Sequence, residues 1–150
     1  MRRDYFTTQT DGVDSDETSK PTLTVSYEGP DEQLRERLDA VDGDDGDGID
    51  ITYRLRDPLD ADDAEGVLAF TNRITGEYVL EINLDADTVL SFVDAAVEYG
   101  DEANGDGRYR TIIKTEQEPV ATFDESTLLV YDSNGDLLRG RSLIPSGVEL

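Results

Sequence analysis

The sequence predicts an α+β fold, in which an antiparallel sheet carries two helices packed on one of its faces. Apolar and polar residues alternate in short runs such as Leu23–Tyr27 and Ile49–Leu55, as they do in strands with one buried face. From Val89 to Val97 the apolar residues instead recur every three or four positions, which is the helical period. Turn residues such as Asn134-Gly135 lie between the runs.

The chain is predicted to form one domain between two short flanking segments. Residues 1–21 are polar and acidic and are expected to be a flexible N-terminal segment. Residues 22–145 hold almost all of the periodic apolar pattern and form the domain, and residues 146–150 form a short tail.

The first half of the domain contains a strand, a helix and a second strand. Residues 22–28 form the first strand, and Pro30 suits the first turn of the helix that follows. The helix presents one narrow apolar stripe to the core, formed by Leu34, Leu38 and Val41. Residues 42–48 are a loop, and residues 49–55 are the second strand.

A hairpin and a long helix follow. Residues 67–71 and 78–84 are predicted to pair around a turn near Thr75-Gly76. Asp85 is a suitable N-cap for the helix, which ends at Gly100. Its core face is formed by Val89, Phe92, Val93, Ala96 and Val97.

Four more strands are expected at residues 108–115, 120–123, 127–132 and 137–143, the last two joined by Asn134-Gly135. The elements also nearly repeat: residues 23–27 match 80–84 at a spacing of 57, and Thr75-Gly76 matches Asn134-Gly135 at 59. A period near 58 suggests a duplicated β-α-β-β unit. Chance similarity of two α+β segments is the alternative, and the sequence leaves both open.

The chain is strongly acidic, with more Asp than Glu and almost no Lys. There are 36 acidic against 13 basic residues, a formal net charge of -23, with 23 Asp against 13 Glu. Lys occurs only at Lys20 and Lys114, and the other eleven basic residues are Arg. This balance resembles that of proteins from extremely halophilic archaea. The resemblance implies a small acidic, uncharacterised protein family adapted to a salt-rich cytoplasm.

Several kinds of chemistry are excluded by composition. The chain has no Cys and no His, so disulfides, thiolate nucleophiles, Ser-His-Asp triads and His-ligated metal sites cannot form within it. No apolar run approaches the roughly 20 residues of a membrane span. The pair Arg2-Arg3 is followed by polar residues and not by the hydrophobic segment of an export signal. We therefore expect a cytoplasmic protein without a cofactor.

An Asp/Gly-rich segment is the one candidate for weak metal binding, through Asp42, Asp44, Asp45 and Asp47. In the register of a helix-loop-helix calcium site, Gly48 falls at position 6, but Gly43 falls at position 1 and Arg54 at position 12, where oxygen ligands are required. The alternative is a solvated acidic loop, which the broken register favours.

Basic residues spaced two apart on predicted strands are the candidate binding residues: Arg54, Arg56, Arg108, Arg110, Lys114, Arg139 and Arg141. Residues two apart on a strand point to the same side, so these side chains are expected on one sheet face. Arg side chains suit phosphate and carboxylate partners. Cross-strand pairing with Glu77, Glu81 and Glu116 is the alternative.

The sequence thus favours a non-catalytic protein that binds an unknown protein partner or associates with itself. A sheet face or an edge strand is the expected contact. A carboxylate-based enzyme that depends on magnesium or calcium is the second class of function that the residues allow. An acidic protein that imitates nucleic acid is the third class. Binding to nucleic acid itself is not expected, because the acidic residues make up so much of the chain.

Overall fold

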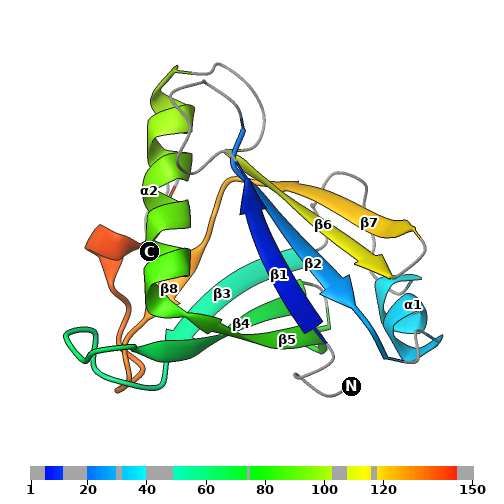
Figure 1. The fold of residues 1–150 in the computed structure, drawn as a ribbon, viewed down its shortest axis with the longest axis horizontal. Helices are drawn as coiled ribbons and strands as arrows, with labels where there is room; N and C mark the ends of the chain where they lie inside the picture. The colour runs from blue at the N-terminus through cyan, green and yellow to red at the C-terminus, as the bar shows by residue number, and fades with distance from the viewer. Residues whose placement is uncertain are drawn as a thin grey trace.

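Two four-stranded sheets form most of the structure (Figure 1). The computed structural model describes residues 6–11, 20–29, 32–39, 49–73, 75–102, 108–115 and 118–144. Sheet A contains, in spatial order, β1 (Phe6–Asp11), β2 (Thr22–Tyr27), β6 (Tyr109–Thr115) and β7 (Pro119–Glu125). Sheet B contains β5 (Tyr78–Asp85), β4 (Glu65–Asn72), β3 (Ile49–Leu55) and β8 (Leu129–Tyr131).

Both sheets are mixed. β2 pairs parallel with β6 and β3 pairs parallel with β8, whereas the other neighbouring strands are antiparallel. The α+β class is confirmed, but the single antiparallel sheet is replaced by two mixed sheets. The physical reason is the area that must be covered: helices of 8 and 17 residues are too short to cover one face of an eight-stranded sheet. Two sheets can cover each other.

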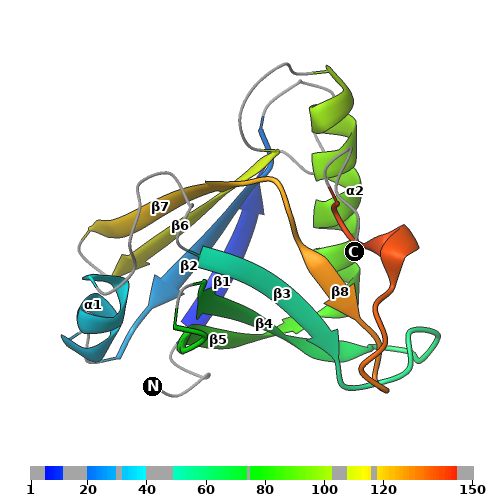
Figure 2. The same cartoon turned by 180° about the vertical axis from the view of Figure 1, so that it is seen from behind.

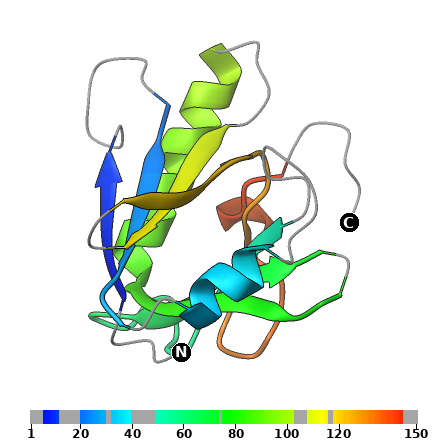
Figure 3. The ribbon, with the colours of Figure 1, turned by 90° about the vertical axis from the view of Figure 1, so that its right-hand side faces the viewer.

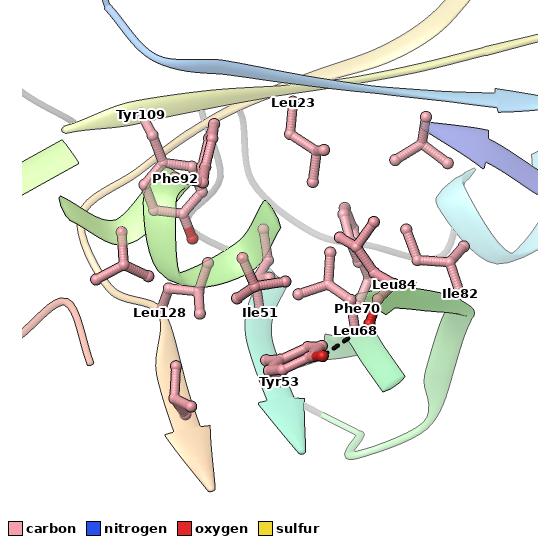
Figure 4. Packing of buried hydrophobic residues seen from close by; sticks show 14 of the residues in the cluster. Leu23, Ile51, Tyr53, Leu68, Phe70, Ile82, Leu84, Phe92, Tyr109 and Leu128 are labelled. Atoms are coloured by element: carbon pink, nitrogen blue, oxygen red, sulfur yellow. Dashed lines mark hydrogen bonds between the residues drawn. The ribbon is translucent and has the colours of Figure 1, made fainter. Parts of the chain in front are cut away.

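The core lies between the inner faces of the two sheets. Each of these faces is built by alternate residues, as in β2 and β3, where every second side chain is buried. Leu23 and Tyr109 extend from sheet A towards Ile51 and Phe70 of sheet B (Figure 4). Phe92 of the long helix meets the ring of Tyr109 edge to face, with ring centroids 5.4 Å apart.

Two tyrosines are fully buried in this core, and each has a partner for its hydroxyl group. Tyr53 donates a hydrogen bond to the carbonyl oxygen of Leu84 at 2.7 Å (Figure 4). Tyr109 donates to the carbonyl oxygen of Thr127 at 2.6 Å. Burial raises the pKa of both phenols well above the ordinary value, so both stay neutral and can donate.

The two helices lie at opposite ends of the pair of sheets and not on one face of a sheet as predicted (Figures 1 and 3). The short helix is α1 (Glu32–Asp39) and the long one is α2 (Ala86–Glu102); both contact β5. Because each sheet already covers the inner face of the other, the helices are left to close the open ends between them.

Helix α2 follows its sequence signals closely. Asp85 caps it, since the carboxylate accepts a hydrogen bond from the backbone N–H of Thr88 at 3.0 Å and another from the hydroxyl group of Thr88. Its predicted core residues are buried except Val97, which is 39% exposed. The helix ends at Glu102, two residues beyond the predicted Gly100.

Two segments differ from the prediction. Residues 6–11, assigned from the sequence to a flexible segment, form the edge strand β1. The predicted strand at residues 137–143 is instead two single bridges, Leu137 to Tyr131 and Leu143 to Leu128, separated by the short 3-10 helix η2 (Arg139–Arg141). The predicted turn at Asn134-Gly135 is present, and Gly135 adopts a φ of 87° that a side chain would disfavour.

The order strand-helix-strand-strand does occur twice, as β2-α1-β3-β4 and as β5-α2-β6-β7. The first strands of the two units pair differently. β2 lies parallel to β6, the first strand of a hairpin, whereas β5 lies antiparallel to β4, the second strand of a hairpin. The internal duplication therefore stays a prediction.

Candidate interaction surface

The seven candidate basic residues lie in three separate places. Arg54 is exposed on the outer face of sheet B, and Arg56 follows the end of β3. The A-sheet group consists of Arg108, Arg110 and Lys114, and the group in η2 consists of Arg139 and Arg141. The prediction that all seven share one sheet face is wrong. Spacing by two places residues on one side of a strand, but these strands belong to different sheets and residues 139–141 are not a strand.

One residue of the A-sheet group, Arg110, shares an acidic partner with Lys20. Asp124 of β7 lies opposite Arg110 of β6, and one of its carboxylate oxygens is 3.0 Å from both Arg110 Nε and Lys20 Nζ. Burial opposes ionisation of Asp124, but the hydrogen bonds from Arg110 and Lys20 outweigh it and hold the pKa below its ordinary value. Arg110 thus forms a cross-strand ion pair, which was the predicted alternative to a binding role. Its partner is Asp124 and not one of the three expected Glu residues.

Replacing this carboxylate is expected to lower stability in a pH-dependent way. We expect Asp124→Asn to reduce the free energy of unfolding at pH 7 by about 1 kcal/mol, because it leaves two cations around a neutral amide. The lowered pKa means that this stabilisation is complete above the unfolded-state pKa of about 3.9 and is lost as the pH falls through the folded-state value.

Urea unfolding at pH 7 and at pH 3, in the same salt, measures the difference. Asp60→Asn is the control, because Asp60 is an exposed loop residue. A difference between wild type and Asp124→Asn that does not shrink at the lower pH would contradict the assignment.

The outer face of sheet B carries a groove of about 280 Å³. It crosses all four strands and is lined by Thr52, Arg54, Val67, Ala69, Tyr78, Glu81, Tyr131 and Gly135. The register explains how these residues meet: Arg54 lies between Val67 and Tyr131 on neighbouring strands, and Ala69 lies between Thr52 and Glu81.

This groove is nearly neutral on a strongly acidic chain. Among the described residues that line it, Arg54 and Glu81 are the charged ones. Its aromatic wall includes Tyr78, whose exposed fraction of 53% is the highest among the exposed large apolar side chains of the described residues. Its floor contains Val67 and Ala69, which point away from the core and yet are only 6% and 7% exposed. An apolar floor with an exposed aromatic side chain is typical of a contact surface.

A second groove, of about 260 Å³, lies between α1 and the turn that joins β4 to β5. Tyr78 lines this groove too, together with Glu36, Arg37 and Glu77. The two hollows therefore meet at one exposed aromatic residue, with the acidic residues on the α1 side.

Sequence reasoning found Arg54 but missed the apolar residues around it. The signal was present in the run Val67-Leu68-Ala69-Phe70, which is apolar at successive positions. A strand with one solvated face alternates, so an unbroken apolar run indicates that both faces are covered or in contact.

The candidate cation ligands Asp42, Asp44, Asp45 and Asp47 lie outside the described residues. Within the residues that the structure describes, no group of three or more acidic side chains is arranged to hold a metal ion. In the same part of the chain, no helix is both long and apolar enough to cross a membrane.

The fold and the groove define an α+β protein of two mixed sheets, with a nearly neutral groove on the outer face of sheet B. The chain belongs to the family of unknown function DUF5793, whose profile matches residues 1–150. Comparisons with curated proteins and with solved structures each find no match.

Proposed function

We propose that this protein is a non-catalytic interaction module that binds a protein partner through the groove on the outer face of sheet B. The observation that supports the proposal most is the contrast in charge. The chain carries a net charge of -23, and a groove that crosses four strands has one Arg and one Glu. A surface with few charged residues loses little hydration when a partner covers it, so this groove is suited to binding another protein.

The size and shape of the groove favour a polypeptide over a small molecule. Its volume of about 280 Å³ is at the lower limit of the roughly 300–1,000 Å³ of small-molecule sites. It lies along a sheet surface, where an extended or helical segment can place one large side chain against Tyr78 and Val67.

Charge complementarity specifies the chemistry of that partner. The groove accepts an aromatic or large aliphatic side chain, while Glu36 and Glu77 lie beside it in the second groove. Arg37 lines that groove too, and it donates a hydrogen bond to the carbonyl oxygen of Val79. The fitting partner is therefore a segment with an apolar anchor residue flanked by Lys or Arg. Arg54 and Glu81 at the centre then orient the backbone or a polar side chain of that segment.

Selection from a displayed library of random peptides, in molar potassium chloride, tests the site. We expect enrichment of peptides with an aromatic residue next to Lys or Arg. Tyr78→Ala should weaken binding of a selected peptide about 30-fold, since truncation of a central aromatic residue costs about 2 kcal/mol. Tyr78 is exposed, so this variant keeps the fold.

Val97→Ala is the matched control, because Val97 is an exposed apolar residue on α2 and does not line the groove. It should leave the affinity for the selected peptide unchanged. Selected peptides that bind Tyr78→Ala as tightly as the wild type, or that are weakened equally by Val97→Ala, would show that the groove is not the contact.

We also propose that the protein works in the salt-rich cytoplasm of a halophilic archaeon. Support comes from the charge composition alone: Asp exceeds Glu, and Lys is almost absent. At roughly 1 M salt the screening length is about 3 Å, so a chain of this charge no longer repels itself at long range.

A further inference from the structure

Strand β1 (Phe6–Asp11) has an open edge. It pairs along its whole length with β2, and on its other side the structure describes no further strand or helix (Figure 3). An edge of this kind presents a row of backbone N–H and C=O groups that can pair with another strand.

The other edge strand of sheet A and one edge strand of sheet B each carry a feature that limits pairing. β7 begins at Pro119, which has no N–H to donate. β5 is covered by α1, and Arg37 Nη1 donates a hydrogen bond to the carbonyl oxygen of Val79 at 3.3 Å. Both are ordinary ways of preventing edge-to-edge pairing.

The last edge strand, β8, is only three residues long and is covered by the segment that follows it (Figure 2). The hydroxyl group of Ser142 accepts a hydrogen bond from the N–H of Val130 at 2.8 Å. The N–H of Leu138 donates to the carbonyl oxygen of Val130 at 2.8 Å. Among the described edges, β1 has no such protection: it contains no Pro, no Lys and no bulge.

The charge around β1 also permits close approach of two chains. Its first five residues are uncharged, and Asp11 at its end is the single acidic residue. Thr24 and Ser26 of the adjacent β2 are uncharged as well. We propose that β1 pairs antiparallel with β1 of a second copy of this chain, which joins two A sheets into one continuous sheet.

The strand is self-complementary in this arrangement. Exposed and half-buried residues alternate along β1, and directly opposed residues must lie on the same face of the sheet. Every symmetric register centred on one residue meets this condition. The two registers nearest the middle of the strand pair the most residues: one places Gln9 opposite Gln9 and Asp11 opposite Thr7, and the other places Thr8 opposite Thr8. In neither does an Asp lie opposite an Asp.

The order of charges in the sequence favours antiparallel over parallel pairing. β1 is preceded in sequence by Arg2, Arg3 and Asp4, whose side chains leave a net positive charge, and it is followed by Asp14 and Asp16. Antiparallel pairing brings the start of one strand beside the end of the other, so opposite flanking charges attract. Parallel pairing would bring like charges together.

Introduced cysteines test the proposal without background, because the chain contains no Cys. We expect light scattering in molar potassium chloride to give twice the mass of one chain. Under mild oxidation of protein at about 10 μM, either Gln9→Cys or Thr8→Cys should form a disulfide-linked dimer on the order of a hundredfold faster than a control. Pairing replaces encounter at that concentration with an effective concentration of about 1 mM.

Thr122→Cys is the control, since Thr122 is an exposed residue on the outer face of sheet A, in the other edge strand, β7. A protein that stays monomeric at high concentration would overturn the proposal. So would a dimer in which neither β1 cysteine reacts faster than Thr122→Cys, because another surface would then hold the copies together. The groove on sheet B is a separate surface, so this result and the peptide selection are independent.

Discussion

On transfer from molar potassium chloride into dilute buffer, the protein is expected to unfold. The formal net charge of -23 on 150 residues makes the compact state repel itself, and salt at roughly 1 M shortens the screening length from about 30 Å at 0.01 M to about 3 Å. We expect the loss to exceed about 5 kcal/mol, which is the whole stability of many single domains. Far-ultraviolet circular dichroism during stepwise dialysis measures it.

A variant with fewer acidic residues separates screening from other effects of salt. Asp60, Asp62, Asp94 and Glu98 are exposed. Changing them to Asn or Gln removes charge without touching the core, so the midpoint of the transition should move to lower salt. A circular dichroism spectrum and melting temperature that are the same in dilute buffer as in molar salt would contradict the expectation.

Gly66→Ala is expected to destabilise the protein more than the loss of the Asp124 ion pair does. Gly66 lies in β4, where the ring of Tyr53 crosses it from β3. An added Cβ would lie 2.6 Å from the carbonyl oxygen of Arg54 and 2.6 Å from both Cζ and the hydroxyl oxygen of Tyr53. These distances are far inside van der Waals contact, so the ring or the strand must move.

The surrounding core and a hydrogen bond hold the ring of Tyr53 in place. Tyr53 is fully buried, and its hydroxyl group donates to the carbonyl oxygen of Leu84. We expect Gly66→Ala to reduce the free energy of unfolding by roughly 3 kcal/mol, the upper part of the range for overpacking a core. Urea unfolding at constant molar salt is the measurement, because guanidinium chloride would change the ionic strength.

A double-mutant cycle tests the cause. In a Tyr53→Leu background the ring is gone and only the contact with the carbonyl oxygen of Arg54 remains, so Gly66→Ala should cost less than in the wild type. Gly140→Ala is the control, since no atom lies within 4 Å of the Cβ that it would add. Equal costs of Gly66→Ala in the two backgrounds would mean that Tyr53 is not the obstacle.

Local signals predicted the elements that depend on neighbours in the sequence. Helix α2 begins after Asp85 and buries its predicted face because capping and periodicity act within a few residues. The β4–β5 hairpin and the turn at Asn134-Gly135 are close in sequence and were found for the same reason.

The errors concern pairings between distant residues. β2 and β6 are parallel neighbours although more than eighty residues separate Leu23 from Thr111 in the chain, and no local pattern specifies that choice. The spacing of two residues correctly predicted that Arg108 and Arg110 belong to the same region of the chain and of the sheet. It carried no information about which sheet holds Arg54. The strand β1 escaped prediction because its threonines give little apolar contrast between its two faces.

The amino-acid sequence by itself determined the α+β class, the long helix and the β4–β5 hairpin, because each follows from patterns within a few residues. It also determined the charge and the absence of His and Cys, which are properties of composition. Only the tertiary structure decided that the eight strands of the described residues divide into two sheets, that Arg54 lies in a nearly neutral groove and that no other described strand pairs with the outer edge of β1. These features depend on which distant strands pair, and that choice is made by burial of the shared core and not by any one segment.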